Sequence, residues 1–138
     1  MADTVRSVEY YYTHVPDKAG AGAKVMNAFK TAGVDLLVYT GFPEGEGQAQ
    51  FDFVPADAAA FRTAARKAGI KLSRPKTAFL LQGDDRTGAV ADVLSKLADA
   101  RISITAMQAV AAGQGRYGAI LWVKPRSVRK ASEVLGAR

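Results

Sequence analysis

The chain contains one twenty-residue segment twice. Residues 17–36 (DKAGAGAKVMNAFKTAGVDL) align without a gap with residues 85–104 (DRTGAVADVLSKLADARISI), at an offset of 68 residues. Six of the twenty pairs are identical, among them Asp17/Asp85 and Gly20/Gly88, and five more keep their chemical character. Self-similarity at a fixed offset predicts two copies of one supersecondary unit. The seam between such copies is a common place for a small-molecule site.

Length and composition limit the classes of protein to consider. A chain of 138 residues, 49% of them hydrophobic, fits one ordinary domain or two small ones. Copies of this size, residues 1–74 and 75–138, are only marginally stable in isolation, so we expect them to pack against each other. The absence of cysteine excludes disulfides and thiolate chemistry. No apolar run approaches the roughly 20 residues that span a bilayer, and the N-terminus lacks a signal-peptide pattern, so we expect a cytoplasmic protein.

The net charge of +6 is unevenly distributed. Residues 1–70 carry a net charge of −1, and residues 71–138 carry +7. Such a balance is typical of a solvated basic surface or of a patch for nucleic acid or an anionic ligand. Because the basic residues are scattered along the second copy, we favour the solvated surface.

Apolar periodicity and turn residues predict the order of the elements. Helical spacing of apolar residues predicts a helix over 19–32, closed by Gly33. The order is βαββαβ followed by βαββα, because the chain stops where an eighth strand would begin. The predicted strands are 6–15, 34–42, 48–54, 70–74, 77–83, 102–110 and 116–124, and the predicted helices are 19–32, 56–69, 86–100 and 125–135.

This order predicts an α+β fold of two tandem ferredoxin-like units. Each unit has an antiparallel sheet with both helices on one face, and the second unit lacks its last strand. The runs FLL (79–81) and AILWV (119–123) are apolar on both faces, which indicates a sheet covered on both sides. We therefore expect a homodimer or larger assembly, joined through the helix-free face or through the exposed edge of the second unit.

The repeated turn resembles the ACT family. The resemblance rests on DKAG and VDL in the first copy and on DRTG and ISI in the second, and it covers nearly the whole chain. It implies a ligand-sensing regulatory domain, usually for an amino acid, whose units pair side by side with the ligand at the seam. A proline commonly precedes the family's glycine, and here Ala19 and Thr87 stand in that place.

The resemblance also implies a set of ligand-binding residues. In the family, backbone amides of the first strand–helix turn and a polar side chain at the start of the second strand hold the ligand. Carried to this chain, these residues are Asp17, Ala19, Gly20 and Asp35 in the first copy, and Asp85, Thr87, Gly88 and Ser103 in the second.

The physics of the turn allows two interpretations. Glycine lets a backbone approach a ligand closely, and a helix N-terminus suits a carboxylate. Alternatively, Asp17, Asp85 or Thr87 caps its helix. If a ligand binds, Asp35 can pair an ammonium by a charge-assisted hydrogen bond and Ser103 cannot. We therefore expect the Asp35 site to be the stronger, where the turn of one unit meets the second strand of its neighbour.

These observations predict a non-catalytic regulatory module that binds an amino acid or a related small molecule, with any regulated partner a separate protein. His14 is the only histidine, and no metal-ligand set, phosphate loop or dinucleotide fingerprint is found, so we expect no enzyme, cofactor, metal or membrane partner. A structural or protein-interaction module that lacks the ligand site is the alternative. An RNA-binding RRM is a third reading, but RYGAILW (116–122) lacks a required glycine and has Ala119 where an aromatic should stack.

Overall fold

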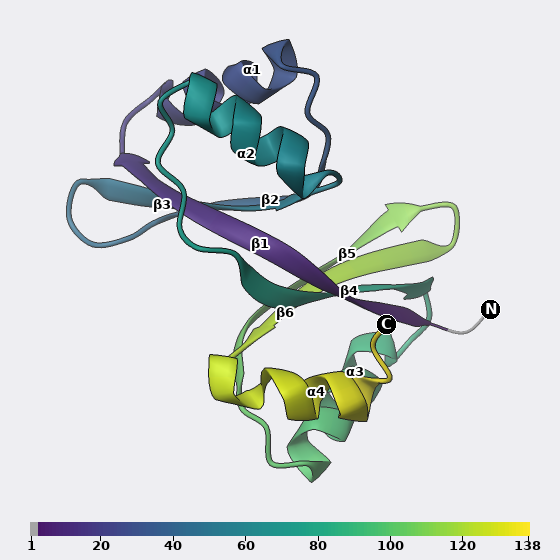
Figure 1. The fold of residues 1–138 in the computed structure, drawn as a ribbon. Helices are drawn as coiled ribbons and strands as arrows, with labels where there is room; N and C mark the ends of the chain where they lie inside the picture. The colour runs from purple at the N-terminus through teal and green to yellow at the C-terminus, as the bar shows by residue number, and fades with distance from the viewer. Residues whose placement is uncertain (1–2) are drawn as a thin grey trace. The chain divides into compact units, whose positions relative to one another are not determined.

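The computed structural model describes residues 3–138 and has an α+β fold with antiparallel strand pairing (Figure 1). No helix among these residues is long and apolar enough to cross a membrane. The first part of the chain forms β1 (Thr4–Pro16), α1 (Ala21–Thr31), β2 (Leu36–Pro43), β3 (Gln48–Pro55) and α2 (Ala58–Lys67). The remainder forms β4 (Lys76–Asp84), α3 (Ala89–Asp99), β5 (Ile104–Gly113), β6 (Arg116–Val123), a short 3-10 turn (Pro125–Ser127) and α4 (Val128–Leu135).

The chain divides into two compact units, each with two helices beside its strands. The first unit is Glu9–Lys76, and the second unit is Thr77–Arg138 together with the residues through Val8. The strand β1 therefore contributes to both units, which differs from a simple division of the chain near residue 74. The strand order is β2-β3-β1 in the first unit and β1-β4-β6-β5 in the second.

The first residues of β1 lie beside β4 in the second unit. The chain ends three residues after α4, and Arg138 exchanges two backbone hydrogen bonds with β1. Its amide donates to the carbonyl of Val5 at 3.0 Å, and its carbonyl accepts from the amide of Ser7 at 2.9 Å. The Val5 side chain packs against the core of the second unit. The edge of β4 is thus covered by β1, a strand that lies far from it in the sequence.

The predicted strand over 70–74 is wrong as a regular strand, although the segment does lie along β1. The amide of Ser73 donates to the carbonyl of Tyr12 at 2.8 Å, and the amide of Tyr12 donates to the Ser73 hydroxyl at 2.9 Å. The Thr13 hydroxyl donates to the carbonyl of Lys71 at 2.6 Å. Because side-chain hydroxyls replace backbone groups in two of these three bonds, the ladder is irregular.

The core of the first unit is a cluster of aromatic rings between its helices and strands. The rings of Phe29 and Phe61 stack at 4.7 Å between centroids, and Phe53 lies 5.4 Å from Phe61. All three side chains are fully buried. Of the three consecutive tyrosines, Tyr11 joins this core, and Tyr10 lies on the opposite face of β1 because side chains alternate along a strand.

The core of the second unit is mainly aliphatic. Its buried side chains include Phe79 and Leu81 from β4, Leu97 from α3 and Leu121 from β6. The two units nevertheless keep the offset of 68 in their sheets, since Tyr11 pairs with Phe53 as Phe79 pairs with Leu121. The repeat therefore preserves the backbone register while the packing differs.

Candidate functional site

The two strand–helix turns have the same backbone geometry. Gly20 and Gly88 are the N-cap residues of α1 and α3, with φ of 89° and 86°, and no side chain caps either helix. The alternative that Asp17, Asp85 or Thr87 caps its helix is therefore wrong. Positive φ explains why glycine stands at both positions. The first turn of each helix keeps backbone amides without intrahelical acceptors.

The aspartates of the repeated motif connect each turn to a hairpin by a backbone hydrogen bond. The amide of Asp17 donates to the carbonyl of Gly47 at 3.0 Å, and the amide of Asp85 donates to the carbonyl of Gly115 at 2.8 Å. Both amides thus have an intramolecular acceptor.

Asp35 and Ser103 lie at the far end of their units from the turns. The strands β1 and β2 both run antiparallel to β3, so they run parallel to each other and end together, with Pro16 opposite Gln48 and Pro43 opposite Ala49. Asp35 precedes β2 and is exposed at the opposite end, where it borders a hollow of about 300 Å³. Ser103, exposed before β5, has the same relation to its turn. No unit brings its own turn and its own polar residue together.

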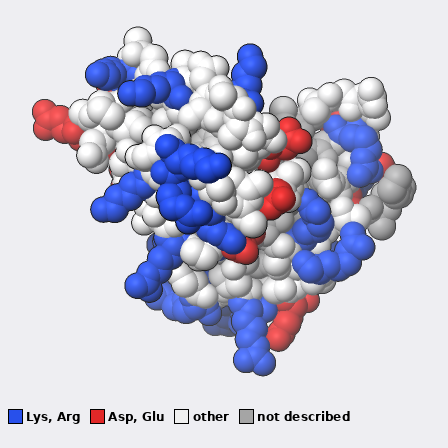
Figure 2. All heavy atoms as spheres, turned by 45° about the horizontal axis from the view of Figure 1, so that its top comes forward, with Lys and Arg blue, Asp and Glu red and all other residues white. Residues whose placement is uncertain are grey.

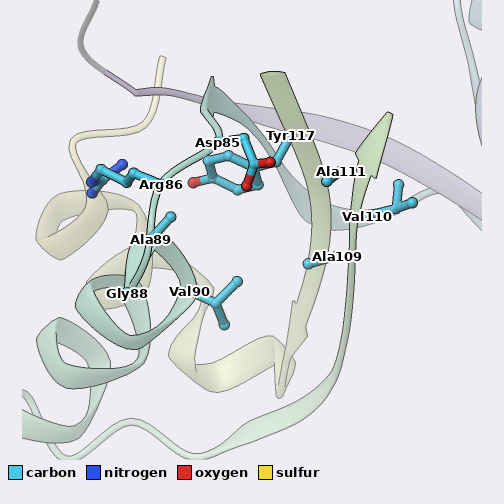
Figure 3. Close-up of a pocket in the computed structure, with 9 residues that line it drawn as sticks. All are labelled: Asp85, Arg86, Gly88, Ala89, Val90, Ala109, Val110, Ala111 and Tyr117. Carbon is cyan, nitrogen blue, oxygen red and sulfur yellow. The ribbon is translucent and has the colours of Figure 1, made fainter. Parts of the chain in front are cut away.

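A hollow of about 240 Å³ lies beside the turn of the second unit (Figure 3). The turn and α3 border it on one side and β5 on the other, with Val90 and Ala109 facing each other across it. Tyr117 of β6 also lines the hollow, as do Asp85 and Gly88 of the predicted site. The strand that borders this hollow, β5, is the edge strand of the unit.

The equivalent space in the first unit is filled by aromatic side chains. A methyl group on Gly22 would lie 3.3 Å from the Phe51 ring, and one on Gly41 would lie 3.2 Å from the Tyr39 hydroxyl. At the offset of 68, Phe51 corresponds to Ala119, so the second unit has a methyl group where the first has a ring. The sequence signal that could have revealed this difference is the exchange of Gly22, Gly41 and Phe51 for Val90, Ala109 and Ala119 in the second copy.

The sequence analysis did not predict a role for Asp3 or Tyr117, which contact each other near the Figure 3 hollow. Asp3 accepts a hydrogen bond from the Tyr117 hydroxyl at 3.2 Å and pairs with Arg86 at 3.3 Å. Burial, and then the charge of Asp3, raise the pKa of the Tyr117 hydroxyl, so this group is a neutral hydrogen-bond donor at neutral pH. Asp3 precedes β1 and lies eighty residues and more from these partners, so no local pattern pointed to it.

Ala19 and Gly20 of the first turn border a separate hollow of about 670 Å³ between the end of β1, α1 and the residues after α2.

Figure 2 shows Lys and Arg side chains at many separate places over the visible face, as the scattered basic residues predict. In residues 3–138, no group of three or more metal-ligating side chains is assembled. The arrangement thus offers hollows for small molecules.

His14 takes part in a polar chain on the helix-free face of the first unit. Its Nε2 lies 3.2 Å from a carboxylate oxygen of Glu44 and 3.1 Å from the amide oxygen of Gln50. The Gln50 side-chain amide donates to Asp52 at 2.8 Å. Burial raises the pKa of the Asp52 carboxyl, and the hydrogen bond from Gln50 partly opposes that rise.

The raised pKa of Asp52 predicts a pH-dependent cost to folding. Because the folded chain holds the Asp52 proton more tightly than the unfolded chain, stability falls as pH rises from the ordinary carboxyl pKa through the raised one. We expect Asp52→Asn to raise the free energy of unfolding near pH 7 and to leave it nearly unchanged near pH 3, as measured by urea denaturation. Glu46→Gln, in the exposed hairpin, should have no such effect. A loss of stability at both pH values would contradict the prediction.

Comparison with known proteins identifies the fold. No family model and no curated protein sequence matches the chain. The solved structure of protein BT0572 from Bacteroides thetaiotaomicron is similar, with a TM-score of 0.81 and 16% identity over 96% of this chain and 88% of that one. The ligand-free regulatory subunit of aspartate kinase from Thermus thermophilus has a TM-score of 0.62 and 15% identity over 99% and 95%.

A structure of aspartokinase alpha and beta subunits is also similar, with a TM-score of 0.60 and 13% identity over 98% of this chain and 95% of that one. At such identities the likeness concerns the fold alone. The chain therefore has the ACT-like α+β fold found in regulatory subunits of aspartate kinase.

Proposed function

We propose that this protein is a non-catalytic regulatory module that binds an amino acid at a site completed by a second copy of the chain. The observation that carries the proposal is the hollow beside the second turn (Figure 3), which is bordered by the edge strand β5. The fold shared with aspartate kinase regulatory subunits supports the same function class. Any regulated enzyme would be a separate partner.

The edge strands β2 and β5 are suited to pairing between copies. Neither LLVYTGFP nor ITAMQAVAAG contains a charged residue, and Leu37, Tyr39, Phe42 and Val110 are exposed apolar side chains on them. Exposed edges usually carry charges that block pairing. Two uncharged edges therefore support a homodimer joined by continuous sheet, and edge pairing is our choice over face pairing.

Antiparallel edge pairing would complete the ligand site. Such pairing sets the start of one strand against the end of its partner. Because the turns lie at the ends of β2 and β5, the residue before β2 in one copy, Asp35, would then lie near a turn of the other copy. A turn at a helix N-terminus suits the ligand's carboxylate, and the Asp35 carboxylate suits its ammonium.

The two candidate polar residues should differ in their effect on ligand binding. We expect Asp35→Ala to abolish the rise in melting temperature caused by the amino acid that binds in a screen of the twenty, because a ligand stabilises only the state it binds. We expect Ser103→Ala to keep most of that rise, and Asp99→Ala, an exposed charge-matched control, to keep all of it. A full rise in Asp35→Ala with none in Ser103→Ala would reverse the ranking.

An interaction module without a ligand is the second candidate, favoured by the rings that fill the first unit's counterpart of the Figure 3 hollow. Isothermal titration against the twenty amino acids decides between the two, since an interaction module would bind none of them. Ala119 lies in the buried core and offers no surface for stacking bases, which argues against RNA; a gel shift with single-stranded RNA checks this point.

A further inference from the structure

The largest of the hollows described above is lined by basic residues and by no acidic ones. Lys18 from the turn, Lys24 from α1 and Lys71 from the segment after α2 line it, with His14 at the end of β1. None of the residues that line it is Asp or Glu. Its volume of about 670 Å³ lies within the range of small-molecule sites, roughly 300–1,000 Å³.

The three lysines form no ion pair within the described chain. In residues 3–138, none of the ion pairs within 4.0 Å involves Lys18, Lys24 or Lys71. The neighbouring Asp17 does not line the hollow. Three like charges around one hollow repel one another, and a bound anion would remove that repulsion.

The second copy of the repeat resolves the same situation internally. At the offset of 68, Lys18 corresponds to Arg86 and Lys24 to Asp92. Arg86 pairs with Asp92 at 3.0 Å and with Asp3 at 3.3 Å. The second unit thus neutralises the cation of its turn with its own carboxylates. The first unit places a second cation, Lys24, where the carboxylate stands, so the internal ion pair of the second unit has no counterpart there.

The backbone adds to the same preference. The α1 N-terminus at Gly20 borders the hollow, and it has no side-chain cap and no acidic residue in its first turn. A partial positive charge at a helix end favours anions. Lysines bind phosphate as point charges, without the planar fork by which arginine fits a carboxylate. More than one negative charge is needed to match three ammonium groups.

We infer that this hollow binds a small, multiply charged anion, whose negative groups are phosphates or several carboxylates. The site lies wholly within the first unit and uses neither Asp35 nor the Figure 3 hollow. In the proposal above the amino acid binds at the Figure 3 hollow beside the second turn, so the hollow at the first turn would give the module a second ligand, a net anion in place of a zwitterion.

The experiment is isothermal titration of the full chain with inorganic pyrophosphate and with citrate, at constant ionic strength. We expect one site per chain, with the tighter of the two probes showing which anionic group is preferred. NMR shifts should concentrate at the amides of residues 15–28 and 68–71. Lys24→Asp introduces the carboxylate that the second copy has, and we expect it to weaken binding by more than about tenfold.

Lys130→Asp is the matched control, because it makes the same change in net charge on the exposed surface of α4 in the second unit. We expect this variant to bind like the parent. Equal weakening by both variants would mean that only net charge matters, and the inference would fail. It would also fail if the parent bound neither probe. Lys71→Gln, which removes one charge outside the helix, serves if Lys24→Asp does not fold by circular dichroism. If the parent chain bound pyrophosphate but none of the twenty amino acids, the result would count against the proposed function and not against this inference.

Discussion

Replacing Phe61 with alanine is expected to lower the free energy of unfolding of the protein by about 3–5 kcal/mol. Phe61 is the meeting point of the first unit's core: its ring lies 4.7 Å from Phe29, 5.3 Å from Tyr11 and 5.4 Å from Phe53. The side chain is fully buried. Truncation removes the burial of a whole ring and leaves a cavity among stiff aromatic neighbours that cannot collapse into it.

Phe42→Ala is the matched control for this truncation. Phe42 is in the same unit but is 41% exposed on the edge strand β2, so the same chemical change should cost less than about 1 kcal/mol. Both values come from urea denaturation followed by circular dichroism, at a concentration where the oligomeric state of the variants is equal by light scattering. Equal losses for the two variants would show that the aromatic cluster does not carry the stability of the unit.

Deleting residues 1–8 is expected to destabilise the second unit, although these residues are far from Thr77–Arg138 in the sequence. The deletion removes the backbone pairing of Val5 and Ser7 with Arg138, the Val5 side chain from the core, and the Asp3 contact with Tyr117. We expect amides of β4 at residues 78–82 to exchange at least about 100-fold faster, equivalent to about 2.8 kcal/mol of local stability. Hydrogen exchange with mass spectrometry measures this change.

A pair of substitutions separates the strand from the mere length of the chain. Val5→Asp places a charge against the apolar core of the second unit and should reproduce most of the deletion's effect. Arg6→Asp changes an adjacent, exposed side chain and should have little effect. If residues 78–82 stay as protected in the deletion as in the parent, the N-terminal strand is not part of the second unit's stability.

Local sequence patterns were sufficient for most helices and strands. The apolar spacing that predicted a helix over 19–32 is confirmed by α1, whose buried face includes Val25 and Phe29. Gly33 ends it with a φ of 72°, as predicted, because a left-handed residue closes a helix most easily as glycine. At the same place in the second copy Arg101 adopts a φ of 59°, which shows that the position, and not the residue, sets this geometry.

Some expectations failed because they depended on partners distant in the sequence. The segment 70–74 was read as a strand from its composition, but hydroxyl groups of Thr13 and Ser73 interrupt its pairing with β1. The supposed caps Asp17 and Asp85 are instead held through their backbone amides by the hairpin glycines. A periodicity argument describes one segment and contains no information about these contacts.

The repeat, the α+β class and the two glycine turns could be predicted from the amino-acid order, because each depends on residues close together along the chain. Only the folded chain shows that β1 contributes to both units, that the rings of Phe51 and Tyr39 crowd Gly22 and Gly41, and that Asp35 lies away from its own turn. These outcomes depend on which strands become neighbours and on side-chain volume at their contacts. Both are settled by packing over the whole chain and not by local preference.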